Sequence, residues 1–257
     1  MSLLHAIILG IIEGVTEFLP ISSTGHMIIA SAMMGIEDND FTKAFEVIIQ
    51  FGAILSVLVL YWRRFLPNWV FYKKLFVAFL PTAIIGFIVK DFVDQLLGSV
   101  DVVAASLIIG GIILIWSDKI FAHLTENGRK TSDLTYLDSI KLGLFQSIAM
   151  IPGVSRSAAT IMGGMTLGMN KKEAAEFSFF LAVPTMAAAT AYKLLKIYKT
   201  IEPNEIGLLA VGCFVGFIVA MVAIKFFIGV VSKYGFKFFG YYRILVGAII
   251  LFYTNFR

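Results

Sequence analysis

The sequence predicts an all-α integral membrane protein with six spanning helices and two re-entrant helical hairpins, arranged as an inverted-topology repeat. Of its 257 residues, 59% are hydrophobic and 15% are charged, and the mean hydropathy is +0.88. A soluble domain of this length is far more polar. We therefore expect a single membrane domain, 1–257, embedded in the lipid bilayer.

Six apolar runs approach the roughly 20 helical residues that a bilayer core requires. They lie at about 43–62, 75–90, 100–117, 174–192, 206–230 and 240–256. The run at 75–90 is the shortest. We expect each run to form one spanning helix.

Two further apolar stretches, 3–36 and 138–169, are interrupted at Pro20 and Pro152. Each proline is followed by Ser, Thr or Gly, and each half is too short to cross a bilayer comfortably. Irregular backbone at membrane depth persists only where protein or a cavity surrounds it. We therefore expect two re-entrant hairpins; two ordinary pairs of spanning helices are the alternative.

The chain also repeats its own plan. A shift of 132 residues superimposes three pairs of like residues: Pro20 on Pro152, Ser23 on Ser155, and Phe45 on Phe177. Repeat one then covers about 1–117 and repeat two about 134–257, each with one hairpin and three spanning helices. An odd number of crossings makes the second unit enter from the opposite side, which predicts an inverted-topology repeat.

Basic residues indicate the orientation, because short cytoplasmic loops carry the excess of Lys and Arg. Four expected loops are basic: Arg63, Arg64, Lys73 and Lys74; Lys119, Arg129 and Lys130; Lys171 and Lys172; and Lys233, Lys237 and Arg243. The loop expected from Asp91 to Asp101, with Asp94 between them, is acidic. We expect the basic loops in the cytoplasm and both termini outside it. The net charge of +4 is spread over these loops, so no nucleic-acid partner is predicted.

The first hairpin carries polar side chains inside an apolar stretch: Glu13, Glu17, Ser22, Ser23, Thr24 and His26. Ionisable groups at membrane depth are costly unless they face a partner or a wet cavity, so this stretch is a candidate site. Glu13 and Glu17 share a helical face and repel each other. A divalent cation such as Mg²⁺ or Ca²⁺ would relieve that repulsion; alternatively, one carboxylate is protonated and acts as an acid or base.

The second hairpin supplies Ser155, Arg156, Ser157 and Thr160 after its proline. The guanidinium fork of Arg156 matches phosphate oxygens, and helix N-termini attract anions. Two tips that enter from opposite faces would meet near the midplane. There, one arginine and two helix N-termini together predict a phosphate or diphosphate ligand. Its predicted binding residues are Arg156, Ser22, Thr24, Ser155, Ser157 and Thr160. A packing role fits Ser22, Ser157 and Thr160 equally well.

Ser23 and His26 are neighbours on one helical turn, so they are candidates for nucleophile and proton carrier in either assignment. Glu46 and Gln50, four residues apart on a spanning helix, are expected to support the site.

Two motifs, Glu13-Gly-x-x-Glu17 running into Pro20-x-Ser-Ser-Thr-Gly-His26 and Pro152-Gly-x-Ser-Arg-Ser157-x-x-Thr160, resemble those of the bacterial undecaprenyl-diphosphate phosphatases, also called bacitracin-resistance proteins. The resemblance extends over nearly the whole chain. Ala158, where we expect Gly in many relatives, is one departure.

The resemblance implies hydrolysis of undecaprenyl diphosphate to undecaprenyl phosphate and phosphate, which recycles the carrier lipid for peptidoglycan synthesis. It implies a multi-pass protein of the bacterial plasma (inner) membrane whose active site faces outward and needs a divalent metal. Glu13 and Glu17 would serve metal binding or proton transfer, and Arg156 would hold the diphosphate. We favour Ser23 as nucleophile, with Glu17 or His26 taking its proton.

Two further expectations remain. Inverted repeats with broken helices are typical of secondary transporters, so a flippase of a polyprenyl phosphate lipid is the alternative function. Small residues at Gly110-Gly111 and Gly212-x-x-x-Gly216 permit close helix pairing, which would allow a homodimer.

Overall fold

The computed structural model describes residues 1–66, 68–97, 99–125 and 128–255. Within these residues the chain is helical, and apart from one isolated bridge between Arg129 and Met169 it forms no β-structure. The helices are α1 (Leu3–Thr16), α2 (Ser23–Met33), α3 (Asp40–Leu60), α4 (Trp69–Leu97), α5 (Val100–Ile120), α6 (Ala122–Thr125), α7 (Tyr136–Ile148), α8 (Arg156–Thr166), α9 (Lys171–Ile197), α10 (Pro203–Tyr234) and α11 (Lys237–Asn255), with short 3₁₀ turns at Trp62–Phe65 and Thr131–Asp133.

Five of the described helices are long and apolar enough to cross a membrane, namely α3, the Trp69–Val93 part of α4, α5, α9 and α10. Four of them contain one of the predicted spanning runs, and α3 covers the fifth, 43–62, except for its last two residues. The run at 75–90 was predicted too short, because α4 is 29 residues long. The sixth predicted span, 240–256, falls on α11, which is helical but is not among these five; residue 256 lies outside the described part of the chain.

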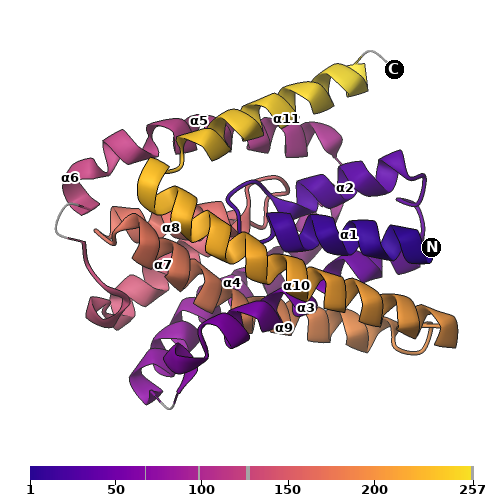
Figure 1. Cartoon of the computed structure of the whole chain (residues 1–257), viewed down its shortest axis with the longest axis horizontal. Helices are drawn as coiled ribbons and strands as arrows, with labels where there is room; N and C mark the ends of the chain where they lie inside the picture. Colours follow the sequence, from indigo (N-terminus) through magenta and orange to yellow (C-terminus); the bar gives the residue numbers. More distant parts are fainter. Residues whose placement is uncertain (67, 98, 126–127, 256–257) are drawn as a thin grey trace.

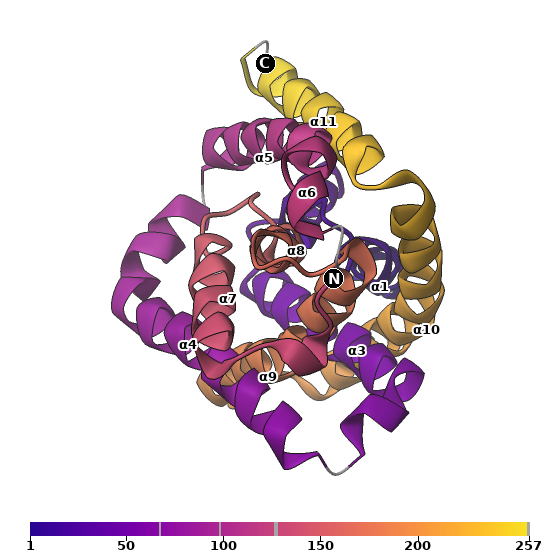
Figure 2. The ribbon, with the colours of Figure 1, turned by 90° about the vertical axis from the view of Figure 1, so that its left-hand side faces the viewer.

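Both predicted helix breaks are present. α1 ends at Thr16 and α2 begins at Ser23, while α7 ends at Ile148 and α8 begins at Arg156. α1 packs against α2, and α7 packs against α8. α8 lies in the middle of the molecule, with α7, α9, α1 and α10 around it (Figure 2), and its residues from Ser157 to Met165 are buried.

Glycines allow several helices to approach closely. Gly111 of α5 faces the backbone of α11 at Gly240, and Gly212 and Gly216 of α10 face α3. α5 and α11 accordingly run side by side (Figure 1). The small-residue patches that suggested a homodimer are therefore occupied by helices of the same chain, and they give no evidence for an interface between chains.

Contacts between the predicted basic loops place all four on one face of the molecule. Two of these contacts are ion pairs, Arg64 with Glu173 at 3.8 Å and Lys171 with Asp118 at 2.8 Å. The other two are hydrogen bonds, from Lys74 to the Ser132 carbonyl and from the Phe236 N–H to Asp118.

Two loop predictions were wrong. Arg243 lies inside α11 and is fully buried, because a set of backbone carbonyls takes its hydrogen bonds. The acidic loop from Asp91 to Asp101 is also much shorter than predicted. α4 continues to Leu97, so Asp91 and Asp94 belong to its last turns, and Asp101 lies in the first turn of α5.

The contact between α1 and α10 yields a stability prediction. A Cβ on Gly14 would lie 2.7 Å from the Val219 Cβ and 2.8 Å from the Gly216 carbonyl oxygen. Gly14→Val should therefore push α1 off α10 and lower the free energy of unfolding by roughly 1–3 kcal/mol. Thermal unfolding in detergent measures this. Gly207→Val is the control, because a Cβ on this helical glycine would meet nothing within 4 Å. Equal melting temperatures for the two variants would contradict the close packing of α1 on α10.

Candidate active site

The two helix breaks, which we call the tips, meet at the N-termini of α2 and α8. Ser22 and Ser155 cap these helices, and their hydroxyls accept hydrogen bonds from the N–H groups of Gly25 at 3.3 Å and Ala158 at 3.2 Å. Both serines have a positive φ, 70° and 75°, and they are the only non-glycine residues of the described chain that do. Such backbone is costly for serine and is found mainly at functional sites.

The matching caps correct the predicted register of the repeat. The structure pairs Ser22, not Ser23, with Ser155, since both have the same cap geometry. Ser23 therefore corresponds to Arg156, each being the first residue of its helix. The two prolines therefore do not correspond, because Pro20 lies two residues before its cap and Pro152 three residues before its cap. Gly153, with a φ of 88°, follows Pro152.

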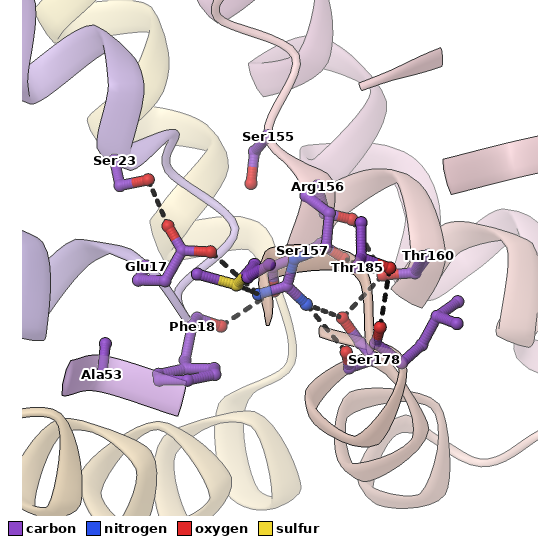
Figure 3. A network of polar contacts seen from close by, with 12 residues as sticks. Glu17, Phe18, Ser23, Ala53, Ser155, Arg156, Ser157, Thr160, Ser178 and Thr185 are labelled. Carbon is purple, nitrogen blue, oxygen red and sulfur yellow. Dashed lines mark hydrogen bonds and ion pairs between the residues drawn. The ribbon is translucent and has the colours of Figure 1, made fainter. Parts of the chain in front are cut away.

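Three side chains form one hydrogen-bonded chain between the tips (Figure 3). Arg156 donates from Nη2 to Glu17 Oε1 at 3.0 Å, and the Ser23 hydroxyl donates to Glu17 Oε2. The other terminal nitrogen of the guanidinium is also fixed, because Nη1 donates to the carbonyl and the hydroxyl of Ser178 at 2.7 and 3.1 Å. A hydroxyl, a carboxylate and a guanidinium are thus brought into one place, as predicted.

A cavity of about 200 Å³ opens at this junction. Six of the predicted site residues line it: Glu17, Ser22, Ser23, Thr24, Ser155 and Arg156. The N-termini of α2 and α8 both meet here, and unpaired N–H groups at helix starts favour an anion. The cavity therefore combines a hydroxyl and a carboxylate with positive potential.

Ser157 and Thr160 lie behind the cavity wall. The Ser157 hydroxyl is fully buried and donates to the Phe18 carbonyl at 2.8 Å, which joins α8 to the first tip. Thr160 donates to the Arg156 carbonyl at 2.8 Å and lies 2.6 Å from the Ser178 hydroxyl. These positions favour the packing role for both residues over direct contact with a ligand.

His26 points away from the cavity and contacts α11. Its Nδ1 lies 2.7 Å from the Ser22 carbonyl oxygen, which only accepts hydrogen bonds, so Nδ1 carries the proton. Nε2 then accepts from the Tyr242 hydroxyl at 2.8 Å, and the two rings stack 5.6 Å apart. Because both ring nitrogens are occupied, the geometry favours Glu17 as the group that takes the Ser23 proton.

Glu13 is fully buried, and no hydrogen-bond donor of the described residues reaches either of its carboxylate oxygens. Glu46 also has one such buried oxygen, Oε1. A buried carboxylate without donors needs a proton or a cation. The described residues contain no group of three His, Cys, Asp or Glu side chains that could hold a metal ion. Glu13 and Glu17 fit a hard divalent cation as a partial ligand set that leaves positions for phosphate oxygens and water.

The sequence interpretation missed the wall that α9 provides. Thr185, Met186 and Ala189 line the cavity, and Gln50, expected only to support the site, lines it as well. The available signal was Pro184, which interrupts the apolar run immediately before Thr185. Thr185 is fixed by an exchange of hydrogen bonds with Gln146 at 3.1 and 3.3 Å.

Comparison with known proteins agrees with this geometry. A family model described as "Bacitracin resistance protein BacA" matches residues 6–249. The chain belongs to this family. Among its relatives, an "Undecaprenyl-diphosphatase" of Bdellovibrio bacteriovorus is 82% identical, and the aligned region covers 98% of this chain and 95% of that protein. Proteins of the same name from Flavobacterium johnsoniae and Aquifex aeolicus are 54% and 46% identical, over 98% and 95% of this chain and 96% of each relative.

In this BacA-family chain, Arg156→Lys tests the guanidinium clamp. Lysine keeps the charge but has no fork, so it cannot serve Glu17 and Ser178 at once. Loss of a charge-assisted hydrogen bond should lower turnover by about 10- to 100-fold, measured as phosphate release by folded protein. Arg64→Lys, on the basic-loop face and more than half exposed, is the control. Near-normal turnover of Arg156→Lys would remove Arg156 from the phosphate site.

Proposed function

We propose that this chain hydrolyses undecaprenyl diphosphate to undecaprenyl phosphate and phosphate where the two tips meet. The reaction recycles the carrier lipid for peptidoglycan synthesis and confers bacitracin resistance. The hydrogen-bonded chain of Ser23, Glu17 and Arg156 beside two helix N-termini carries this conclusion. It provides what cleavage of a phosphoric anhydride needs: a nucleophile, a proton acceptor and positive charge for the phosphate oxygens.

In the first step the Ser23 hydroxyl attacks the terminal phosphorus and passes its proton to Glu17. The bond from that phosphorus to the bridging oxygen breaks, and undecaprenyl phosphate leaves with the bonding electrons. Arg156 has two functions in this step: it binds the phosphate oxygens, and it controls whether Glu17 can take a proton. When its guanidinium turns to the phosphate oxygens, the Glu17 carboxylate is relieved of its ion pair and can take the proton.

Glu17 then releases its proton to solvent. In the second step a water molecule attacks the phosphorus of the phosphoserine and gives a proton to Glu17; the bond from phosphorus to the Ser23 oxygen breaks, that oxygen takes the proton from Glu17, and inorganic phosphate leaves. The anion-binding N-termini of α2 and α8 stabilise the charge that develops on the phosphoryl oxygens in both steps. Met150, Met186 and Ala189 give the same cavity an apolar side that suits the first units of a polyprenyl chain.

A divalent cation, Mg²⁺ or Ca²⁺, would be held by Glu13 and Glu17. When bound, it would neutralise phosphate charge and polarise the phosphoryl group. The buried Glu13 carboxylate without donors supports this assignment.

We also propose that the helices form an inverted repeat, with α1–α5 as one unit and α7–α11 as the other. The packing pairs support this: α1 packs on α10 as α7 packs on α4, while α3 packs on α9 and α5 on α11. In this arrangement α1–α2 and α7–α8 are re-entrant hairpins that enter from opposite faces of the bilayer, and α11 is the sixth spanning helix.

The protein is proposed to lie in the bacterial inner membrane with its active site open to the extracytoplasmic side. The joined basic loops support this orientation, since such loops face the cytoplasm. The polyprenyl diphosphate would then enter from the outer leaflet.

Detergent-solubilised protein should release phosphate from a polyprenyl diphosphate, although it has no membrane across which to transport a lipid. Ser23→Ala should lose almost all turnover and still bind substrate, because Arg156 and both helix N-termini remain. Absence of phosphate release by folded wild-type protein would favour the flippase alternative.

The attacking group is identified by rapid quench with a substrate labelled in its terminal phosphate. Label on Ser23 supports the proposed phospho-enzyme, whereas label on His26 would overturn it. Failure to trap any phospho-enzyme would favour direct attack by water. His26→Ala should retain partial turnover, because Glu17, not His26, is hydrogen-bonded to Ser23.

Metal dependence is tested through Glu13. Chelation should abolish phosphate release, and Glu13→Gln should require more added Mg²⁺ or Ca²⁺ for half-maximal turnover and should bind the metal more weakly in calorimetry. Glu37→Gln, an exposed carboxylate change, is the control. Full activity after exhaustive chelation would leave Glu13 and Glu17 as acid/base groups only.

A further inference from the structure

Among the residues that the structure describes, Arg243 of α11 is the largest side chain that is completely buried. A guanidinium has five N–H donors, and all five of those of Arg243 are used. They reach five backbone carbonyls, those of Leu107 at 3.2 Å, Pro20 at 3.1 Å, and Val154, Ser106 and Gly153 at 2.9 Å each. The charge is thus stabilised by carbonyl dipoles, and none of these partners is a carboxylate.

The five carbonyls belong to three segments. Pro20 lies in the first tip, Gly153 and Val154 lie in the second, and Ser106 and Leu107 belong to α5. Nη1 alone joins the two tips, since it donates both to Pro20 and to Val154. Pro20 is two residues before the cap of α2, and Val154 immediately precedes the cap of α8.

We propose that Arg243 is a positioning residue for the phosphatase reaction, because it fixes the separation between the helix start that carries Ser23 and the helix start that carries Arg156. The proposal rests on the catalytic roles proposed for those two residues. Arg243 does not line the cavity, so it acts through the backbone of the tips and not on the substrate.

Other contacts between the tips cannot replace this one during turnover. The pair of Arg156 and Glu17 opens when the diphosphate binds, because Arg156 then turns to the phosphate. The remaining link described above is the hydrogen bond from Ser157 to the Phe18 carbonyl, which is neutral and single. Arg243 therefore keeps the tips in register in the state in which the reaction occurs.

α5 leaves space for this arrangement. A Cβ on Gly110 would collide with the Arg243 guanidinium, so glycine at this position allows the side chain to reach the tips. Gly110→Ala consequently displaces the guanidinium while the arginine is retained.

The test compares Arg243→Lys with wild type in detergent, with kcat and KM determined separately for phosphate release per folded molecule. Lysine has three donors on one nitrogen and cannot span five carbonyls. Since a misplacement of about 1 Å can cost about 100-fold in rate, we expect kcat to fall by about 10- to 100-fold and KM to change by less than about threefold.

Arg129→Lys is the matched control, because Arg129 also donates to backbone carbonyls, of Leu167 and Asp133 at 3.0 Å each, but on the basic-loop face. It should keep the wild-type kcat per folded molecule. A wild-type kcat in folded Arg243→Lys, or an equal loss in Arg129→Lys, would overturn the proposal. If Arg243→Lys does not fold, Gly110→Ala decides: a fall in kcat supports the proposal, and a wild-type kcat in folded protein overturns it.

A double-mutant comparison separates positioning from general stability. If Arg243 and Ser157 both hold the tips, Arg243→Lys combined with Ser157→Ala should lower kcat by more than the product of the two single losses. Arg129→Lys combined with Ser157→Ala should give the simple product. Wild-type protein without phosphate release would instead refute the proposed function, whereas an active wild type, an inactive Ser23→Ala and an unaffected Arg243→Lys would refute only the role of Arg243.

Discussion

Non-helical backbone in an apolar interior must find its hydrogen bonds within the protein, and the rest of this structure depends on how that constraint is met. In each tip the chain is no longer helical, so its backbone carbonyls lack the N–H donors that a helix provides. Arg243 donates hydrogen bonds to three of these carbonyls, and the Ser157 hydroxyl donates to a fourth. The close approach of α5 and α11 brings Arg243 within reach. Because these donors satisfy the carbonyls of the tips on the side away from the cavity, the N-termini of α2 and α8 can point toward the cavity.

In the cavity the positive charge of Arg156 is neutralised by the carboxylate of Glu17. Breaking a largely buried pair is costly unless another anion takes the guanidinium, which is the part that the proposed function gives to the diphosphate. In that proposal binding and activation are joined, since the contact that recruits Arg156 to the substrate also frees the carboxylate beside Ser23. Ser178 keeps the other end of the guanidinium fixed during this exchange.

Much of this could be predicted from the sequence, because hydropathy and proline breaks are local signals. The helical segments, both breaks and the meeting of Glu17, Ser23 and Arg156 were confirmed. The register was wrong by one residue, because it was set on Pro20 and Pro152, which stand at different distances from the caps Ser22 and Ser155. The contact of His26 with Tyr242 spans 216 residues of sequence, and the carbonyls that bury Arg243 lie 89 to 223 residues away from it. The sequence offers no local signal for either.

The proposed repeat also explains why the site is asymmetric. Gly10 of α1 packs on a backbone carbonyl of α10 as Gly143 of α7 packs on one of α4, so these glycines correspond, and so do Glu13 and Gln146, each three residues further along. Gln146 is a neutral amide whose hydrogen bonds with Thr82 and Thr185 are all made within the protein. Glu13, in the equivalent place, has no donor. A neutral side chain therefore meets the packing needs of this position, so packing does not account for a carboxylate there. The cost of burying Glu13 is offset by a proton or a cation. Under the proposed function, this assigns the acid and metal chemistry to the first repeat and anion binding by Arg156 to the second.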